Sequence, residues 1–189
     1  MDTQSYQKVA SYEVKEGKID KVLLLYSGGL DTSVMLKWLQ DHYGAKVTTL
    51  TLDLGQQHDD LDAIKEKALT LGAIEAILLD AKDEFADEYL AKGIKANAHY
   101  QGEYHLSTAM ARAVSAKKGV EIAQKKGIKC IAHGCTGKGN DQVRFDGYIL
   151  ALDGTMKIIA PASRSDRMRP ARFVRSPAGP SSGFSLVWM

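Results

Sequence analysis

The chain has 189 residues, of which 44% are hydrophobic and 25% charged, and its formal net charge is +2. These values are typical of one globular domain with a real core, and the mild charge argues against a nucleic-acid-binding protein, which would carry a dense basic patch. No apolar run approaches the length of a membrane span, and residues 1–20 lack the apolar segment of a secretory signal. We therefore predict a cytoplasmic protein that binds neither nucleic acid nor a membrane. Residues 1–20 are interpreted as a disordered leader, with a peripheral strand as the alternative.

From Lys21 onward, strand-like and helix-like segments alternate. The strand-like segments are short and either apolar or rich in β-branched residues, and they cover residues 22–26, 46–52, 74–79, 128–133 and 156–160. Between them, apolar residues recur at helical spacing near 34–39 and over 59–71, 83–98 and 108–126. In the helix expected over 83–98, Phe85, Tyr89 and Ile94 are predicted to face inward. The alternation predicts an α/β fold with a doubly wound, mostly parallel five-stranded sheet and helices on both faces.

The composition changes near Pro161. Up to that residue the chain contains many lysines and only two arginines, whereas residues 162–189 contain five arginines, three of the four prolines and no lysine. This segment is either a flexible tail or a stretch foreign to the domain's design, such as a shifted reading frame or a truncated copy. We therefore divide the chain into a leader (1–20), an α/β domain (21–161) and an irregular tail (162–189).

The first candidate site follows the first strand. Ser27-Gly28-Gly29-Leu30-Asp31-Thr32-Ser33 connects a buried strand to a helix start. Glycines let an anion approach the unpaired N–H groups of the first helical turn, and hydroxyls add further donors. No lysine precedes the Ser/Thr pair as in a P-loop, so backbone and hydroxyls would hold a phosphate. The alternative is an ordinary capped helix start.

A second glycine-rich loop follows the fourth strand, in the run HGCTGKGNDQVRF of residues 133–145. Asn140, Asp141 and Arg144 lie within one helical turn, where Asp can receive an ammonium and Arg can clamp a carboxylate. The alternative is a helix capped by Asn140, with Asp141 and Arg144 as a solvated ion pair. Because ligands bind outside the carboxyl ends of parallel strands, we expect both loops to open on the same edge of the sheet.

Other candidate chemistry is weaker. Cys130 and Cys135 lack the spacing of a zinc or redox motif and are expected to be reduced thiols. His58, Asp59, Asp60 and Asp62 are interpreted as the acidic start of a helix rather than a metal site, so no protein-bound metal is predicted. His133 is a weak candidate for orienting the second loop.

Residues 26–33, YSGGLDTS, resemble the pyrophosphatase-loop motif of N-type ATP pyrophosphatases, which have an adenine nucleotide alpha hydrolase-like fold. Together with HGCTGKGNDQVRF, they make the chain similar to argininosuccinate synthase from about Lys21 to Pro161. The resemblance implies a ligase of arginine biosynthesis and the urea cycle that joins citrulline and aspartate through a citrullyl-adenylate, releasing AMP and pyrophosphate. It also implies ATP, with Mg²⁺ carried by its phosphates.

The resemblance assigns roles by motif. The ATP-binding residues would be Tyr26, Ser27, Gly28, Gly29, Leu30, Asp31, Thr32, Ser33, Leu52 and Gly134. Citrulline would be bound by Tyr104, Thr108, Asn140 and Arg144, and aspartate by Thr136, Asn140 and Asp141. Asp141 and Arg144 would be the catalytic residues. Two departures from the family pattern are Leu52, where a small residue is usual, and Ala109, where some members have serine.

The family continues past this point into a synthetase domain and a C-terminal helix, which supply further citrulline contacts and the interface of a homo-oligomer. The likeness found here stops at Pro161, so we expect the nucleotide-binding part to be present and the rest of the catalytic site to be incomplete. Two alternatives are a non-catalytic ATP-binding remnant and another ATP pyrophosphatase, such as a tRNA-modifying enzyme.

Overall fold

The computed structural model describes residues 19–56, 60–135 and 139–160. Most of the predicted leader, the tail over 162–189, and Thr136 lie outside these residues. Five parallel strands form one sheet in the order β3-β2-β1-β4-β5. The strands are β1 (Lys21–Leu25), β2 (Lys46–Asp53), β3 (Glu75–Asp80), β4 (Cys130–Ala132) and β5 (Lys157–Ile159). The predicted doubly wound α/β sheet is confirmed.

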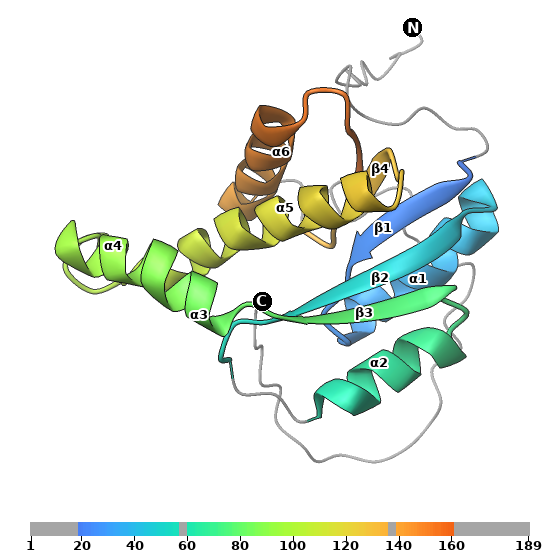
Figure 1. The fold of residues 1–189 in the computed structure, drawn as a ribbon, viewed down its shortest axis with the longest axis horizontal. Coiled ribbons are helices and arrows are strands. Elements are labelled where there is room, and N and C mark those ends of the chain that lie inside the picture. Colours follow the sequence, from blue (N-terminus) through green and yellow to red (C-terminus); the bar gives the residue numbers. More distant parts are fainter. Residues whose placement is uncertain (1–18, 57–59, 136–138, 161–189) are drawn as a thin grey trace, which may run out of the picture.

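Helices cover both faces of this sheet (Figure 1). The long ones are α1 (Leu30–Tyr43), α2 (Leu61–Thr70), α5 (Ser107–Lys125) and α6 (Asn140–Leu152). One face packs against α1 and α2, and the other against α5 and α6. Within the described ranges, no helix has the length and apolarity needed to cross a membrane.

The side chains of β1 alternate between the two cores. Val22 and Leu24 are fully buried with Met35 and Leu39 of α1, whereas the fully buried Leu23 faces the cluster that contains Ile149 of α6. A strand buried on both faces needs apolar residues on both of them, and Val22, Leu23 and Leu24 supply these in β1. Burial of each such leucine contributes about 1.5–3 kcal/mol to the free energy of folding. The carboxyl end of β1 is therefore a rigid support for the loop that follows it.

The predicted helix over 83–98 is interrupted. It consists of α3 (Lys82–Glu84), a π-helical turn η1 (Phe85–Leu90) and α4 (Ala91–Lys95). Phe85 is buried as predicted, but Ile94 is 79% exposed, so the prediction that Ile94 faces inward is wrong. The wider π turn rotates the residues that follow out of α-helical register, and α4 projects away from the sheet, where there is little core to face (Figure 1).

The order of the strands reverses between β1 and β4. From β1 the chain adds β2 and β3 on one side, then returns across the sheet to add β4 and β5 on the other. In open α/β sheets, this reversal leaves a crevice outside the carboxyl ends of the two central strands. The two glycine-rich loops follow β1 and β4, so the topology brings them to the same crevice.

Candidate functional site

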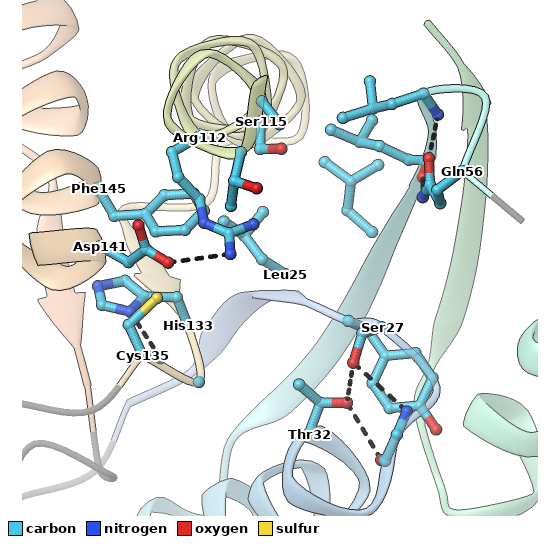
Figure 2. A pocket seen from close by; sticks show the side chains of 18 of the residues that line it. Leu25, Ser27, Thr32, Gln56, Arg112, Ser115, His133, Cys135, Asp141 and Phe145 are labelled. Atoms are coloured by element: carbon cyan, nitrogen blue, oxygen red, sulfur yellow. Dashed lines mark hydrogen bonds and ion pairs between the residues drawn. The ribbon is translucent and has the colours of Figure 1, made fainter. Parts of the chain in front are cut away.

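A cavity of about 930 Å³ lies at the carboxyl ends of β1, β2 and β4. The first glycine loop contributes Ser27, Gly29, Leu30, Asp31 and Thr32, and the second contributes His133, Gly134, Cys135, Gly139, Asn140 and Asp141. The helix α5 adds Thr108, Arg112 and Ser115 to the lining. Figure 2 shows Ser27 and Thr32 on one side of the cavity, with Arg112 and Asp141 across from them. The two loops therefore line one cavity, as their positions after parallel strands predict.

The first loop forms an uncapped helix start. Gly29 is the N-cap of α1 with extended backbone, and within the described part of the chain no side chain caps it. The hydroxyls of Thr32 and Ser33 instead donate to the carbonyl of Gly29, at 3.3 and 2.8 Å, and Thr32 Oγ1 lies 3.1 Å from Ser27 Oγ. The first-turn N–H groups are thus left for water or an anion. This arrangement argues against the alternative of an ordinary side-chain-capped helix.

Gly28 needs to be glycine for two reasons. Its φ of +79° lies in the left-handed region, which side chains with a Cβ rarely adopt. A Cβ there would also lie 2.7 Å from Cγ1 of Ile64 in α2. The loop is therefore packed directly against α2.

Asp141 joins the two arginines found before Pro161. Its Oδ2 accepts from Nη2 of Arg112 and its Oδ1 from Nη1 of Arg144, both at 3.0 Å. Arg112 is 5% exposed, and its guanidinium lies 5.7 Å from the centre of the Phe145 ring. The predicted pair of Asp141 and Arg144 is present, with side chains that are 31% and 33% exposed, and the buried guanidinium of Arg112 extends it to a three-residue cluster. Arg112 lies 29 residues before Asp141, in a helix segment without a recognisable motif. Its contact with Asp141 was therefore not predicted from the sequence.

His133 is buried and makes several contacts that its position in the sequence did not predict. It is 1% exposed, and its Nε2 lies 2.9 Å from Oδ1 of Asp146 in α6. The N–H of Cys135 donates to its Nδ1 at 3.4 Å, so the ring proton is assigned to Nε2, which donates to Asp146. Its ring also stacks on Phe145. These contacts tie the end of β4 to α6 and fix where the second loop begins.

The thiols in this region are not activated. Burial raises the pKa of Cys135 to about 11 and that of Cys130 to about 12. Arg112 acts in the opposite direction on Cys135, but more weakly than burial. Both side chains therefore remain neutral thiols at neutral pH, consistent with ordinary reduced cysteines.

Most of the residues that the family motifs assign to a ligand line the cavity. Those that line the cavity are Tyr26, Ser27, Gly29, Leu30, Asp31, Thr32, Leu52, Thr108, Gly134, Asn140 and Asp141. Gly28, Ser33, Tyr104 and Arg144 are not in the lining, and Thr136 lies outside the described residues.

The residues outside the lining have identifiable places. Ser33 is buried with its hydroxyl 2.9 Å from that of Tyr26, so it supports the loop from within. Tyr104 is 47% exposed in a turn that pairs with Tyr100, away from the cavity. Arg144 reaches the lining only through Asp141. The N-cap of α6 is Gly139, so the alternative with Asn140 as the cap is wrong, and Asn140 opens into the cavity instead.

The acidic run near the start of α2 does not form a described metal site. Asp60 is the N-cap of α2 and accepts from the N–H groups of Asp62 and Ala63. His58 and Asp59 lie outside the described residues. Over the ranges that the structure describes, no group of three or more His, Cys, Asp or Glu side chains could hold a metal ion.

Comparisons with known proteins agree with this architecture. The family model for the arginosuccinate synthase N-terminal HUP domain matches residues 21–174, beyond the Pro161 boundary of the resemblance. The argininosuccinate synthase of Picrophilus torridus is 55% identical over 159 residues, covering 82% of this chain and 40% of that protein. That of Thermoplasma acidophilum is 55% identical over 151 residues, covering 80% and 37%. The chain thus spans about two-fifths of the length of these relatives.

A solved structure shares the fold. It is described as a predicted subunit of a tRNA methyltransferase from Methanocaldococcus jannaschii, with a TM-score of 0.54 and 15% identity over 80% of this chain and 74% of that one. At such low identity the likeness concerns the fold alone. From the family match over most of the chain and the high identity to several synthases, we conclude that this chain belongs to the argininosuccinate synthase family, with its N-terminal HUP domain over residues 21–174.

Proposed function

We propose that this chain binds Mg-ATP between its two glycine-rich loops and acts in the ATP-dependent joining of citrulline and aspartate to argininosuccinate. The observation that carries the proposal is the shared cavity: an uncapped helix start on one wall and a partly buried Arg–Asp–Arg cluster on the other. The first wall suits an anion, and the second suits small molecules that carry both carboxylate and ammonium groups.

The cavity fits a nucleotide in size and in the chemistry of its lining. A volume of about 930 Å³ is within the range of small-molecule and cofactor sites. Ser27, Gly29 and Thr32 would face the phosphates, and the apolar wall of Leu25, Leu50, Leu52 and Leu54 would suit the adenine ring. Asp31 is the one carboxylate that the first loop places in the lining. Mg²⁺ would therefore be held mainly by phosphate oxygens.

The second loop lies against the start of α1 at Gly134. A Cβ at this position would make van der Waals contact, at 3.4 Å, with both Sδ of Met35 and Cγ2 of Thr32. A side chain larger than that of alanine would have to displace one of these neighbours. This close contact supports a role for Gly134 beside the nucleotide, where the reacting groups of ATP and citrulline would meet.

The Arg–Asp–Arg cluster would bind the amino-acid substrates. Two guanidinium groups and one carboxylate leave a net positive charge, which attracts substrate carboxylates. Each carboxylate oxygen of Asp141 has lone pairs beyond the one that its arginine uses, so it can still accept from the ammonium of aspartate. Asn140 and Thr108 add neutral donors and acceptors in the lining.

The proposed reaction has two displacements. The ureido oxygen of citrulline attacks the α-phosphorus of ATP, and the bond to the β,γ-pyrophosphate breaks, giving citrullyl-adenylate. The amine of aspartate then attacks the ureido carbon, AMP leaves with the former ureido oxygen, and the amine loses a proton. The chain's contribution would be orientation of the substrates and stabilisation of the charge on the departing pyrophosphate by the amides of α1.

Titration calorimetry with Mg-ATP, followed by a pyrophosphate-release assay, tests the proposal. We expect saturable Mg-ATP binding and pyrophosphate release that depends on citrulline. Binding without citrulline-dependent release would restrict this chain to nucleotide binding, and release that depends on tRNA would favour a tRNA-modifying enzyme. Absence of Mg-ATP binding would refute the proposal.

A further inference from the structure

We propose that Lys67 of α2 is a positioning residue for the first glycine loop, where the backbone N–H groups at the start of α1 would bind the phosphates of ATP. Its ammonium group binds the carbonyl of Gly28 and thereby orients the Gly28–Gly29 peptide with its N–H toward the phosphates. This inference rests on the proposed ATP binding, and it assigns a lysine to a loop whose own sequence contains none.

The contact comes from a helix that packs behind the loop. Nζ of Lys67 donates to the carbonyl oxygen of Gly28 at 2.7 Å, across 39 residues of sequence. Ile64, one helical turn earlier, fills the space where a side chain of Gly28 would project. Residues three apart share one face of a helix. One face of α2 therefore contacts Gly28 in two ways: Ile64 packs against its Cα, and the ammonium of Lys67 donates to its carbonyl.

The geometry of the peptide explains how this contact acts on the cavity. No described peptide bond is cis, and in a trans peptide the C=O and N–H point in opposite directions. With the Gly28 carbonyl turned toward α2, the N–H of Gly29 is turned away from it, toward Ser27. Ser27 and Gly29 line the cavity, whereas Gly28 does not.

The hydrogen bond that this amide makes within the loop is weak. The N–H of Gly29 donates to Oγ of Ser27 at 3.4 Å, near the limit of a hydrogen bond. A phosphate oxygen would be a much stronger acceptor for the same N–H. The ammonium of Lys67 polarises the peptide from the carbonyl side, which strengthens the N–H as a donor. A P-loop lysine contacts phosphate itself, whereas Lys67 acts from behind through the backbone.

Three variants test the role by titration calorimetry. Lys67→Met removes the ammonium, Lys67→Arg keeps a cation, and Lys65→Met removes an exposed lysine from the same helix with the same change in net charge. We expect Lys67→Met to bind Mg-ATP roughly fivefold to tenfold more weakly, as for the loss of one charge-assisted contact. Adenosine affinity should be unchanged in all variants. Lys67→Arg should recover most of the Mg-ATP affinity, and Lys65→Met should match the parent chain.

A spectroscopic measurement separates positioning from a general effect on folding. The ¹⁵N chemical shift of the Gly29 amide reports the hydrogen bond at the Gly28 carbonyl, so it should move in unliganded Lys67→Met and stay in place in Lys65→Met. An unmoved Gly29 signal, or an equal loss of adenosine and Mg-ATP affinity, would overturn the role of Lys67.

If the parent chain binds no Mg-ATP, the proposed function fails, while the Gly29 signal still decides whether Lys67 orients the peptide. Unchanged Mg-ATP affinity in Lys67→Met beside a parent chain that binds would refute only the Lys67 proposal.

Discussion

Single residues set the geometry of the cavity, and Gly28 is the most constrained of them. It combines a left-handed φ of +79° with a Cβ position only 2.7 Å from Ile64. Gly28→Ala is therefore expected to lower the free energy of unfolding by about 2–3 kcal/mol, the sum of backbone strain and overpacking. Urea denaturation measures this loss, and the displaced loop should bind Mg-ATP less tightly.

Gly44 supplies a matched control for this substitution. Its φ is +62°, but a Cβ there would meet no atom within 4 Å. Gly44→Ala should therefore cost only the strain, about 1 kcal/mol, and leave Mg-ATP affinity intact. Equal losses of stability in the two variants would show that packing against Ile64 is unimportant.

The two cysteines provide a prediction about pH. A thiol is protonated below its pKa, and burial holds the pKa of Cys135 at about 11. At pH 8 the reactive thiolate is then roughly one part in a thousand. We expect alkylation by iodoacetamide to be very slow at pH 8 in the folded protein and fast after unfolding in urea. Rapid reaction of folded protein at pH 8 would mean that Cys135 is activated by its neighbours.

At the scale of elements, α3 and α5 are joined by Glu84, which accepts from Lys117 and forms an ion pair with Lys118. Hydrogen bonds from Lys117, and then from Lys118, lower the pKa of Glu84 below its ordinary value. A lowered pKa means that the folded state favours the carboxylate. The resulting stability is present above the ordinary pKa of glutamate and is lost as pH falls through the lowered pKa.

Glu84→Gln should therefore destabilise the protein by about 1 kcal/mol at pH 7, and the difference from the parent chain should shrink as pH is lowered below 4. Thermal unfolding over this pH range measures the effect. Asp87→Asn, an exposed acidic residue in the adjoining π turn, serves as the control. A difference that is the same at pH 7 and pH 3 would contradict the linkage.

The elements also show how far sequence reasoning reaches. Buried parallel strands and the long helices were predictable because their apolar periodicity is dictated by burial on both faces of the sheet. The π turn after Phe85 was not, because periodicity over 83–98 does not reveal one extra residue in a turn. Both glycine-rich loops were identified from local motifs, whereas Arg112 in the cavity lining and Lys67 behind the first loop come from distant helices and are placed by tertiary packing alone.

At the scale of the whole molecule, ligand binding should be coupled to folding, because the cavity is built from the ends of three strands and from helices on opposite faces of the sheet, α1 on one and α5 and α6 on the other. A ligand that binds only the folded state at 100 times its Kd adds about 2.7 kcal/mol of stability. For a chain of this size we expect Mg-ATP to raise Tm by roughly 5–10 °C. Differential scanning fluorimetry measures the shift, with Mg²⁺ alone as the control. An unchanged Tm at saturating Mg-ATP would be inconsistent with binding at this cavity.

The position of β1 between β2 and β4 has a consequence for synthesis on the ribosome. β1 pairs with β2, which follows it closely, and with Ile131 and Ala132 of β4, more than a hundred residues later. At about 5–20 residues per second, roughly 3–10 seconds separate the translation of β3 from that of β4. During that interval the nascent chain carries the first glycine-rich loop beside an open strand edge, which needs protection from pairing with other chains. The half of the cavity proposed to bind the nucleotide is therefore made first, and the half proposed to bind the amino acids completes both the sheet and the site.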